Sequence, residues 1–242
     1  MRAKHPDGFV RSFSSERTVP QTVDYHRPQN SCRLDNIPSV AADLLTLYGS
    51  TDATAKSAKD AGAVVVSEPT RGYGRACRAG MNAAVKAGAN IVVFIDGDGS
   101  DCPEFMNELI RPIQENCFDF VIGSRTRGTR ETGSLNMQQI FAARLAGWLL
   151  RVRYGVNFTD MSPFRAIRSE LLQSLPMREE TYGWNLEMQM LVAQRRARIL
   201  EIPVNHRRRR GGVSKVSGTF KGTFLAAFRI AATFFRVAFS LH

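Results

Sequence analysis

The stretch Ile91-Val-Val-Phe-Ile-Asp-Gly-Asp-Gly-Ser-Asp101 decides how the rest of the chain is interpreted. Five apolar residues, mostly β-branched or aromatic, run directly into two carboxylates, Asp96 and Asp98, which are two positions apart. A short, continuous apolar run of this kind predicts a buried strand, and such strands are typical of parallel sheets. Parallel sheets bind ligands just outside the carboxyl ends of their strands, so we expect both carboxylates to lie at a binding site.

The two carboxylates also indicate what binds there. Like charges this close repel each other, and a divalent cation is the simplest way to offset the repulsion. Carboxylate oxygens suit a hard divalent cation, and a cation so held usually also contacts a phosphate. Gly97 and Gly99 carry no side chains, which lets a ligand approach the backbone closely. The stretch therefore predicts a metal site at Asp96 and Asp98.

Three kinds of site place acidic residues after a strand in this way. An EF-hand loop is excluded because it needs Gly and Glu at its sixth and twelfth positions, where this chain has Asp101 and Asn107. A phosphohydrolase of the haloacid-dehalogenase type would use Asp96 as nucleophile, but its motif normally lies on the first strand. The third kind is the metal–nucleotide site of a glycosyltransferase. The residues alone leave the last two open.

Composition limits the class of partner. The chain has 242 residues, 43% of them hydrophobic, with a formal net charge of +11 and a pI of about 10.1. This excess of positive charge favours an anionic partner such as a nucleotide, a lipid phosphate or a nucleic acid. The four cysteines show no C-x-x-C pairing, so no zinc site is indicated. We expect neither a signal peptide nor a membrane-spanning helix, since no uncharged apolar stretch reaches the required ~20 residues.

Apolar periodicity alternates between strand and helix along the chain. Strands are predicted at 43–48, 63–67, 91–95, 118–123 and 198–204, with a short strand within 159–167; helices are predicted at 53–61, 75–87, 103–115, 135–153, 184–196 and 220–239. This order predicts an α/β fold with a mostly parallel sheet and helices on both faces. Asp101 can cap the helix predicted at 103–115, which has Pro103 in its first turn. We divide the chain into an irregular or disordered segment (1–38), the α/β domain (39–217) and a C-terminal amphipathic helix (218–242). That helix carries Arg229 and Arg236 on one face, and either packing or a membrane interface would suit it.

Three further groups of residues carry chemistry. Gly72-x-Gly74 opens a helix and could cradle a phosphate, although Cys77 replaces the third glycine of a dinucleotide fingerprint. Asp160 lies in Thr159–Arg165, and Glu187 follows Trp184, for which core packing is the simpler interpretation. The basic run 207–210, followed by Gly-Gly and Lys215, is typical of an anion-binding loop; it has no interleaved aromatics for stacking on single-stranded nucleic acid.

Together, the order of these motifs resembles the family 2 glycosyltransferases of inverting GT-A fold, and among them the polyprenyl- or dolichyl-phosphate sugar synthases. The resemblance spans roughly residues 43–220 and depends on many blocks in the right order. The blocks are Gly49-Ser-Thr-Asp-Ala-Thr-Ala55, Arg71-Gly-Tyr-Gly-Arg-Ala76, Asp96-Gly-Asp98, Val121-Ile-Gly-Ser-Arg125, Asp160-Met-Ser-Pro-Phe-Arg165, Tyr182-Gly-Trp-x-x-Glu187 and Arg210-Gly-Gly-Val-Ser-Lys215.

The resemblance implies a reaction and a role for each site residue. A hexose would move with inversion from a nucleotide-sugar, UDP-glucose or GDP-mannose, to a polyprenyl-phosphate-type acceptor. It implies a cytoplasmic enzyme in peripheral contact with the cytoplasmic membrane surface and no nucleic-acid partner. The implied roles are Mg²⁺ or Mn²⁺ binding by Asp96 and Asp98, donor contacts by Asp52, Gly72, Gly74 and Asp96, catalytic carboxylates at Asp98 and Asp160, and acceptor-phosphate contacts by Arg125, Arg210 and Lys215.

The chain also departs from the family pattern. The usual opening strand and Pro-x-x-Asn-Glu motif have no counterpart in residues 1–40, and Leu47-Tyr48 replaces the usual Asp-Asp or Asp-Asn. Ser100 stands where some members have a metal-binding Gln, and Ala142-Ala143 replaces a common Gly-Asn. We hypothesise that unrelated sequence replaces the first βα unit, which would impair the site for the base. A phosphohydrolase and a non-catalytic protein that binds anionic lipid or nucleic acid stay open as alternatives.

Overall fold

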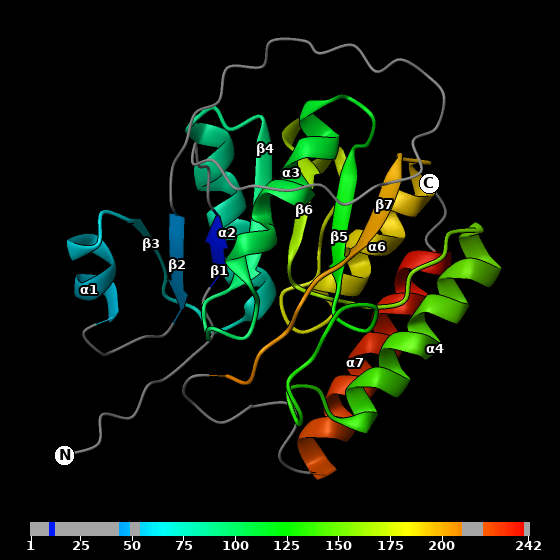
Figure 1. Ribbon diagram of the computed structural model, residues 1–242. Coiled ribbons are helices and arrows are strands. Elements are labelled where there is room, and N and C mark those ends of the chain that lie inside the picture. Colours follow the sequence, from blue (N-terminus) through cyan, green and yellow to red (C-terminus); the bar gives the residue numbers. More distant parts are fainter. Residues whose placement is uncertain (1–9, 13–43, 49–53, 210–219, 240–242) are drawn as a thin grey trace.

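The computed structural model describes residues 10–12, 44–48, 54–209 and 220–239, and these form an α/β fold built on one sheet (Figure 1). The sheet has seven strands in the order β3-β2-β1-β4-β6-β5-β7. The strands are β1 (Val10–Ser12), β2 (Leu44–Tyr48), β3 (Val64–Glu68), β4 (Ile91–Asp96), β5 (Phe120–Ser124), β6 (Arg165–Arg168) and β7 (Ile199–Pro203). Five strands run parallel to one another (β2, β3, β4, β5 and β7), and β1 and β6 run antiparallel to them. The sheet is therefore mixed but mostly parallel, as predicted.

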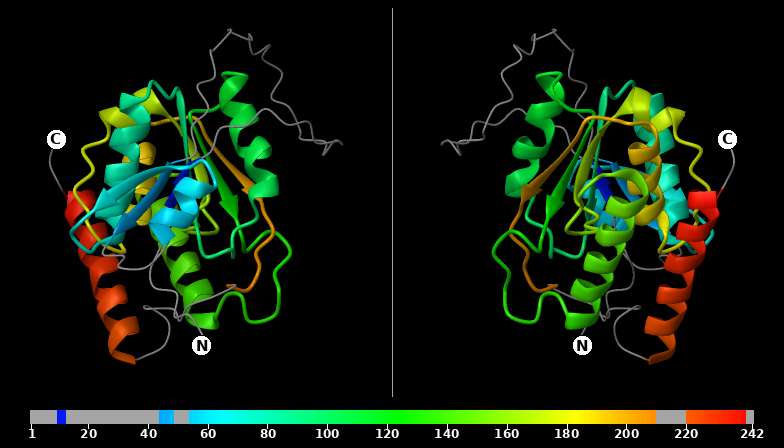
Figure 2. Two further views of the ribbon diagram at one scale, coloured as in Figure 1. Left: turned by 90° about the vertical axis from the view of Figure 1, so that its left-hand side faces the viewer. Right: turned by 90° about the vertical axis from the view of Figure 1, so that its right-hand side faces the viewer.

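Helices cover both faces of this sheet, as predicted (Figure 2). They are α1 (Thr54–Asp60), α2 (Tyr73–Lys86), α3 (Met106–Gln114), α4 (Met137–Tyr154), α5 (Ser169–Ser174), α6 (Trp184–Gln194) and α7 (Phe220–Phe239), with a 3₁₀ turn at Pro103–Phe105. Strand β4 shows how the two faces are filled, because successive side chains of a strand point to opposite sides. Val92 and Phe94 join the core beneath α2 and α6, whereas Val93 and Ile95 join the core beneath α3.

Most predicted elements lie within a few residues of the observed ones. Helix α4 begins later than the predicted residue 135 because Asn136 caps it: its side chain accepts a hydrogen bond from the Gln139 backbone N–H, and the Gln139 side chain accepts one in return. The helix ends at Gly155, which has a left-handed φ of 73° that glycine adopts without strain. Helix α5 was not predicted, since six residues are too few to show a clear period.

Two predictions about local structure need correction. Val10–Ser12 is a strand within the segment predicted to be irregular, and β1 fills the position between β2 and β4. Three residues show no periodicity, and backbone pairing with two neighbours stabilises a strand of any sequence. Asp101 was predicted to cap the helix that follows; instead Cys102 precedes the 3₁₀ turn, and Asp101 accepts a hydrogen bond from the Asp96 N–H (3.1 Å).

The topology brings chemistry-bearing residues to one edge of the sheet. Asp96 ends β4, Arg125 follows the end of β5, and His206 follows the end of β7. Strand β6 is antiparallel, so its first residue, Arg165, pairs with Phe94 and Ile122 close to the same edge. Asp160 precedes β6 and is therefore delivered to this edge as well.

Helix α7 packs on α6 through a buried polar contact. Glu187 is fully buried and accepts hydrogen bonds from the backbone N–H groups of Arg178 and Glu179 and from Arg236 of α7 (2.9 Å). Thr233 adds a hydrogen bond to Glu179 (2.8 Å). No helix in the described part of the chain is sufficiently long and apolar to span a membrane.

Candidate active site

The acidic turn after β4 is held by its own side chains. Ser100 donates hydrogen bonds from its backbone N–H (2.9 Å) and its hydroxyl (2.5 Å) to Oδ1 of Asp98. The hydroxyl of Tyr73 lies 3.5 Å from Oδ1 of Asp96. The turn therefore presents Asp96 and Asp98 in fixed positions at the sheet edge, with Asp101 directly behind them.

Crowding of three carboxylates changes the acidity of Asp96. Burial and the negative charges of Asp101 and Asp98 raise the pKa of Asp96 to about 8, although the positive charges of Arg209 and Arg125 oppose this shift. A bound cation would relieve this repulsion, so the donor set fits a hard divalent ion. The described residues contain no cluster of three or more His, Cys, Asp or Glu arranged to hold a metal. One or two carboxylates are enough for Mg²⁺ when substrate phosphates complete its coordination.

A basic strap, which we define as residues 206–209, lies across the acidic turn. The backbone N–H of Arg207 donates a hydrogen bond to the carbonyl of Ser100 (2.8 Å), and Nε of Arg209 lies 3.0 Å from Oδ2 of Asp98. At the start of the strap, Nδ1 of the buried His206 is 3.6 Å from Oδ1 of Asp101. Within the described residues, neither of these two buried atoms has a hydrogen-bond partner. A cationic guanidinium thus contacts the carboxylate that was predicted to bind metal.

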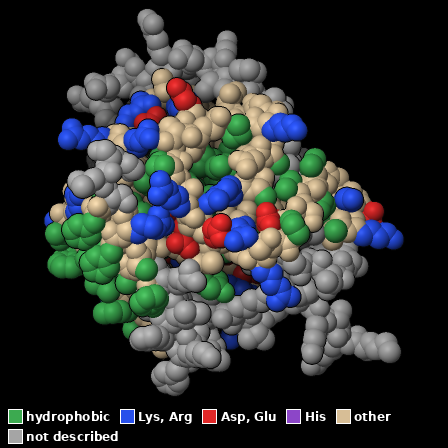
Figure 3. All heavy atoms as spheres, turned by 180° about the vertical axis from the view of Figure 1, so that it is seen from behind, with side chains coloured by type: hydrophobic (Ala, Val, Ile, Leu, Met, Phe, Trp, Pro, Cys, Tyr) green, Lys and Arg blue, Asp and Glu red, His purple; other side chains and the backbone are tan. Residues whose placement is uncertain are grey.

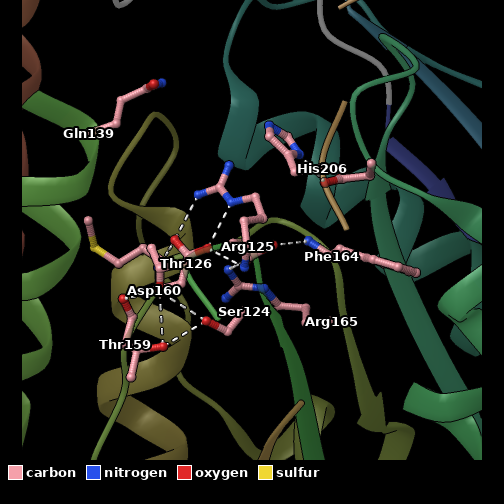
Figure 4. A network of polar contacts seen from close by, with 12 residues as sticks. Ser124, Arg125, Thr126, Gln139, Thr159, Asp160, Phe164, Arg165 and His206 are labelled. Carbon is pink, nitrogen blue, oxygen red and sulfur yellow. Dashed lines mark hydrogen bonds and ion pairs between the residues drawn. The ribbon is translucent and has the colours of Figure 1, made fainter. Parts of the chain in front are cut away.

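Arg125 and Asp160, predicted separately, are bonded to each other (Figure 4). Asp160 accepts three hydrogen bonds of 2.8 Å from Arg125: from the backbone N–H, from Nε and from Nη2. Met161 donates a fourth through its backbone N–H (2.7 Å), and Gln189 binds the Asp160 carbonyl (2.9 Å). Burial alone would raise the pKa of Asp160, but the charge and hydrogen bonds of Arg125 lower it overall. Asp160 is therefore ionised and fixes the direction of the Arg125 side chain.

Hydroxyl groups surround this ion pair on its β5 side. Ser124 lies 2.7 Å from the Thr159 hydroxyl and 3.1 Å from that of Thr126. The backbone N–H of Thr159 is bound in turn by the Glu201 carboxylate of β7 (2.9 Å). These contacts join the ends of β5 and β7 to the segment that carries Asp160, which makes the site rigid.

The glycines predicted to cradle a phosphate contact the protein's own backbone. A Cβ atom at Gly72 would lie 2.6 Å from the Glu180 carbonyl oxygen, and one at Gly74 would lie 2.4 Å from that of Glu179. Helix α2 begins at Tyr73, two residues before its predicted start, so Gly74 is inside it. Their absent side chains let segment 179–180 pack against α2, and this contact seats Tyr73 beside Asp96.

The structure brings together four predicted site residues, Asp96, Asp98, Arg125 and Asp160, at one sheet edge. Three others, Asp52, Arg210 and Lys215, lie outside the described residues. Trp184 is buried in the core, as its simpler interpretation expected, while Glu187 anchors α7.

Sequence reasoning did not assign Tyr73, Asp101 or His206 to the site, and it included Arg209 only as part of the basic run 207–210 that was predicted to bind an anion. Arg209 and His206 belong to a basic segment that was recognised as a whole, but the signal did not distinguish among neighbouring residues. Tyr73 lies between Gly72 and Gly74, where only the two glycines were given a role. Asp101 was assigned to helix capping because it precedes Pro103.

Comparison with known proteins identifies the family to which the chain belongs. A family model described as glycosyl transferase family 2 matches residues 48–176. The chain is also 35% identical over 196 residues to an uncharacterized glycosyltransferase of Mycobacterium tuberculosis, with 78% of this chain and 84% of the relative aligned. The chain therefore belongs to glycosyltransferase family 2. This membership removes the phosphohydrolase from consideration.

More distant relatives carry more specific names. A dolichyl-phosphate hexose transferase of Haloferax volcanii is 32% identical, with 74% of this chain and 75% of the relative covered. An undecaprenyl-phosphate mannosyltransferase of Micrococcus luteus is 29% identical, with 70% and 71% covered.

Solved structures confirm the fold. Glucosyl-3-phosphoglycerate synthase from Mycobacterium tuberculosis in complex with UDP matches with a TM-score of 0.62 at 24% identity, covering 81% of this chain and 68% of that one. The same synthase in complex with Mn²⁺, UDP-glucose and phosphoglyceric acid matches with a TM-score of 0.59 at 23% identity, covering 81% and 68%. The predicted GT-A-like fold is thus confirmed.

Proposed function

We propose that this chain transfers a hexose, with inversion, from UDP-glucose or GDP-mannose to a polyprenyl-phosphate-type lipid acceptor. The observation that carries the proposal is the meeting, at one sheet edge, of the acidic pair Asp96 and Asp98 with the fixed cation Arg125. An enzyme that joins a diphosphate donor to a phosphate acceptor must hold two anions close together, and such a site needs both groups. The names of the two polyprenyl- and dolichyl-phosphate relatives support the choice of acceptor.

The donor side of the proposal rests on the acidic turn. Asp96 and Asp98 would hold Mg²⁺ or Mn²⁺, and Ser100 keeps Asp98 in position through its two hydrogen bonds. When bound, the cation neutralises the diphosphate leaving group. Asp52, Gly72 and Gly74 remain proposed donor contacts; for the two glycines, the close approach of segment 179–180 adds a packing role.

The acceptor side of the proposal rests on Arg125, with Arg210 and Lys215 as further proposed contacts. A lipid phosphate is already ionised at neutral pH, so it needs orientation more than it needs a strong base. Asp160 fixes the guanidinium of Arg125 through two side-chain hydrogen bonds. Among the described residues, nothing forms a hydrogen bond with Nη1 of Arg125, which leaves that nitrogen to donate to an anion. Asp160 thus acts by positioning Arg125.

The strap supplies a positive charge that offsets part of the negative charge of the acidic turn. Arg209 pairs with Asp98 across 3.0 Å and offsets its charge where a metal would otherwise do so. Filling the donor site would release Arg209 from Asp98. The freed side chain could then contact a phosphate, which predicts that donor binding precedes acceptor binding.

A transfer assay tests this function. Purified protein is incubated with Mn²⁺, a polyprenyl phosphate and radiolabelled UDP-glucose or GDP-mannose, and labelled lipid is extracted. We expect labelled lipid with one donor, and its loss with chelator or in Asp98→Asn. Asp60→Asn is the matched control, because Asp60 is an exposed carboxylate on α1. Metal-dependent transfer that survives in Asp98→Asn would refute the metal role, and phosphate release without sugar transfer would refute the reaction.

A further inference from the structure

Helix α4 presents large apolar side chains to solvent along its whole length. We name this set the α4 stripe: Met137, Phe141, Leu145, Trp148 and Val152, exposed by 46–78%. Their spacing of three or four residues places them on one face of the helix. Helix α7 adds the exposed rings of Phe228, Phe235 and Phe239. Hydrophobic side chains gather on the side of the molecule where α4 and α7 lie (Figure 3).

The exposure is a property of one helix face and not of a frayed helix. Residues on the opposite face of α4, Ala143, Ala146, Gly147 and Leu150, are buried. Gly147 allows such close packing that a Cβ there would lie 1.9 Å from the Phe158 carbonyl oxygen. A contiguous apolar face on a firmly seated helix marks a surface that another body covers.

The charged residues of α4 and α7 themselves are all of one sign. Neither α4 nor α7 contains an Asp or a Glu in its 18 or 20 residues. Arg144, Arg151 and Arg153 of α4 are exposed. Helices α4 and α7 run side by side in the same direction (Figures 1 and 2), and Arg153 ties their C-terminal ends through a hydrogen bond to the Ala238 carbonyl (3.2 Å). The partner should therefore offer an apolar interior beneath a layer of negative charge.

We propose that the α4 stripe, with the exposed rings of α7 beside it, docks on the surface of an anionic lipid bilayer. Apolar side chains would enter the boundary between headgroups and acyl chains, and the arginines would contact lipid phosphates. A second copy of this chain is a poorer partner: a two-fold interface would face arginines with arginines, on a chain of net charge +11, with no acidic residue of either helix to offset them.

Docking through α4 would also bring the site to its substrate. The buried face of α4 packs on Phe158, two residues before Asp160, while the apolar face points outward. The inference rests on the proposed function in this one respect: a lipid acceptor lies in the membrane on which α4 would rest. The sequence left the C-terminal helix open between packing and a membrane interface, whereas here α4 carries the larger part of the docking surface.

Trp148 provides a built-in probe. The chain has two tryptophans, Trp148 on the stripe and Trp184 in the core, so a change in fluorescence on docking reports Trp148. Full-length protein is mixed with vesicles of phosphatidylcholine alone or with added phosphatidylglycerol, containing neither donor nor polyprenyl phosphate. We expect binding in a flotation assay and a blue shift only with the anionic vesicles. The Trp148→Phe variant should bind anionic vesicles without a blue shift of its tryptophan fluorescence.

Variants assign the binding to the stripe. Phe141→Ser with Leu145→Ser should weaken binding about tenfold or more, because two apolar side chains that would enter the bilayer are lost. The matched control is Val64→Ser, which removes an apolar side chain exposed by 55% on β3. This variant should bind the vesicles as tightly as the native chain. Arg144→Gln with Arg151→Gln should weaken anionic binding, whereas Lys56→Gln with Lys59→Gln, on α1, should weaken it less.

Two results would overturn the proposal: no binding to anionic vesicles, or a stable dimer in sedimentation that the Phe141→Ser and Leu145→Ser pair dissolves. Transfer to a short-chain, water-soluble phosphate acceptor is measured in parallel. If transfer occurs without vesicle binding, only the docking inference fails. If vesicles bind but no donor supports transfer, only the proposed function fails.

Discussion

Arg125 and Asp160 form a two-point ion pair, with both Nε–Oδ2 and Nη2–Oδ1 distances at 2.8 Å. The Asp160 side chain is 1% exposed and that of Arg125 is 15% exposed, so water cannot replace Arg125 as the partner of the Asp160 carboxylate and reaches only a small part of the guanidinium. Removing one member of such a pair leaves the other buried and uncompensated. The pair should therefore affect stability as well as activity.

Asp160→Asn should lower the free energy of unfolding by roughly 3 kcal/mol, as expected for a broken buried ion pair. Urea unfolding followed by tryptophan fluorescence measures this. Glu115→Gln is the control, because it breaks the exposed Arg111–Glu115 pair and should cost no more than about 0.5 kcal/mol. Equal costs for the two variants would show that Arg125 finds another partner when Asp160 is neutral.

The same pair gives a prediction about pH. The pKa of Asp160 in the folded protein is below its usual value of about 3.9, so at acid pH the unfolded state binds more protons than the folded state. Its contribution is complete above that value and is lost as the pH falls through the folded pKa. The difference in stability between the native chain and Asp160→Asn should thus be constant near neutral pH and shrink in acid. A difference that grows in acid would contradict the lowered pKa.

A third prediction concerns Gly74 in α2. In a helix interior, alanine is normally more stable than glycine by about 1 kcal/mol, so helix propensity alone predicts that Gly74→Ala stabilises the protein. The new Cβ would lie 2.4 Å from the Glu179 carbonyl oxygen, and such overpacking costs about 1–3 kcal/mol. We expect net destabilisation in urea unfolding, with faster hydrogen exchange in the 178–181 segment. Stabilisation by Gly74→Ala would show that this close approach is absent in solution.

The sequence predicted most of the fold because its signals are local. Strand β4 is a continuous apolar run, and α7 has its predicted bounds of 220–239, because its length makes its period unambiguous. The acidic end of β4 was also visible, since strand and carboxylates are adjacent in the sequence. Each of these predictions used interactions within a single element.

What the sequence did not reveal depends on residues far apart in the chain. Gly72 and Gly74 resembled a phosphate cradle, and their contact with segment 179–180 lies more than a hundred positions away. The pairing of Arg125 with Asp160 likewise joins two loops that only the antiparallel insertion of β6 brings together. Strand β1 is too short for any pattern, and its place is set by the backbones of β2 and β4.

The contact between Arg209 and Asp98 gives the last prediction. If Arg209 offsets the charge of Asp98 in the absence of metal, a cation must displace the guanidinium before it can bind. Arg209→Gln should then bind Mn²⁺ about fivefold more tightly, which corresponds to the ~1 kcal/mol interaction of two charges at this distance in a largely aqueous setting. Isothermal titration of Mn²⁺ into donor-free protein measures the affinity. Lys59→Gln removes the same unit of charge from α1 and should leave the affinity nearly unchanged. Weaker Mn²⁺ binding by Arg209→Gln would mean that Arg209 supports the metal site, and the proposed exchange of one cation for another would fail.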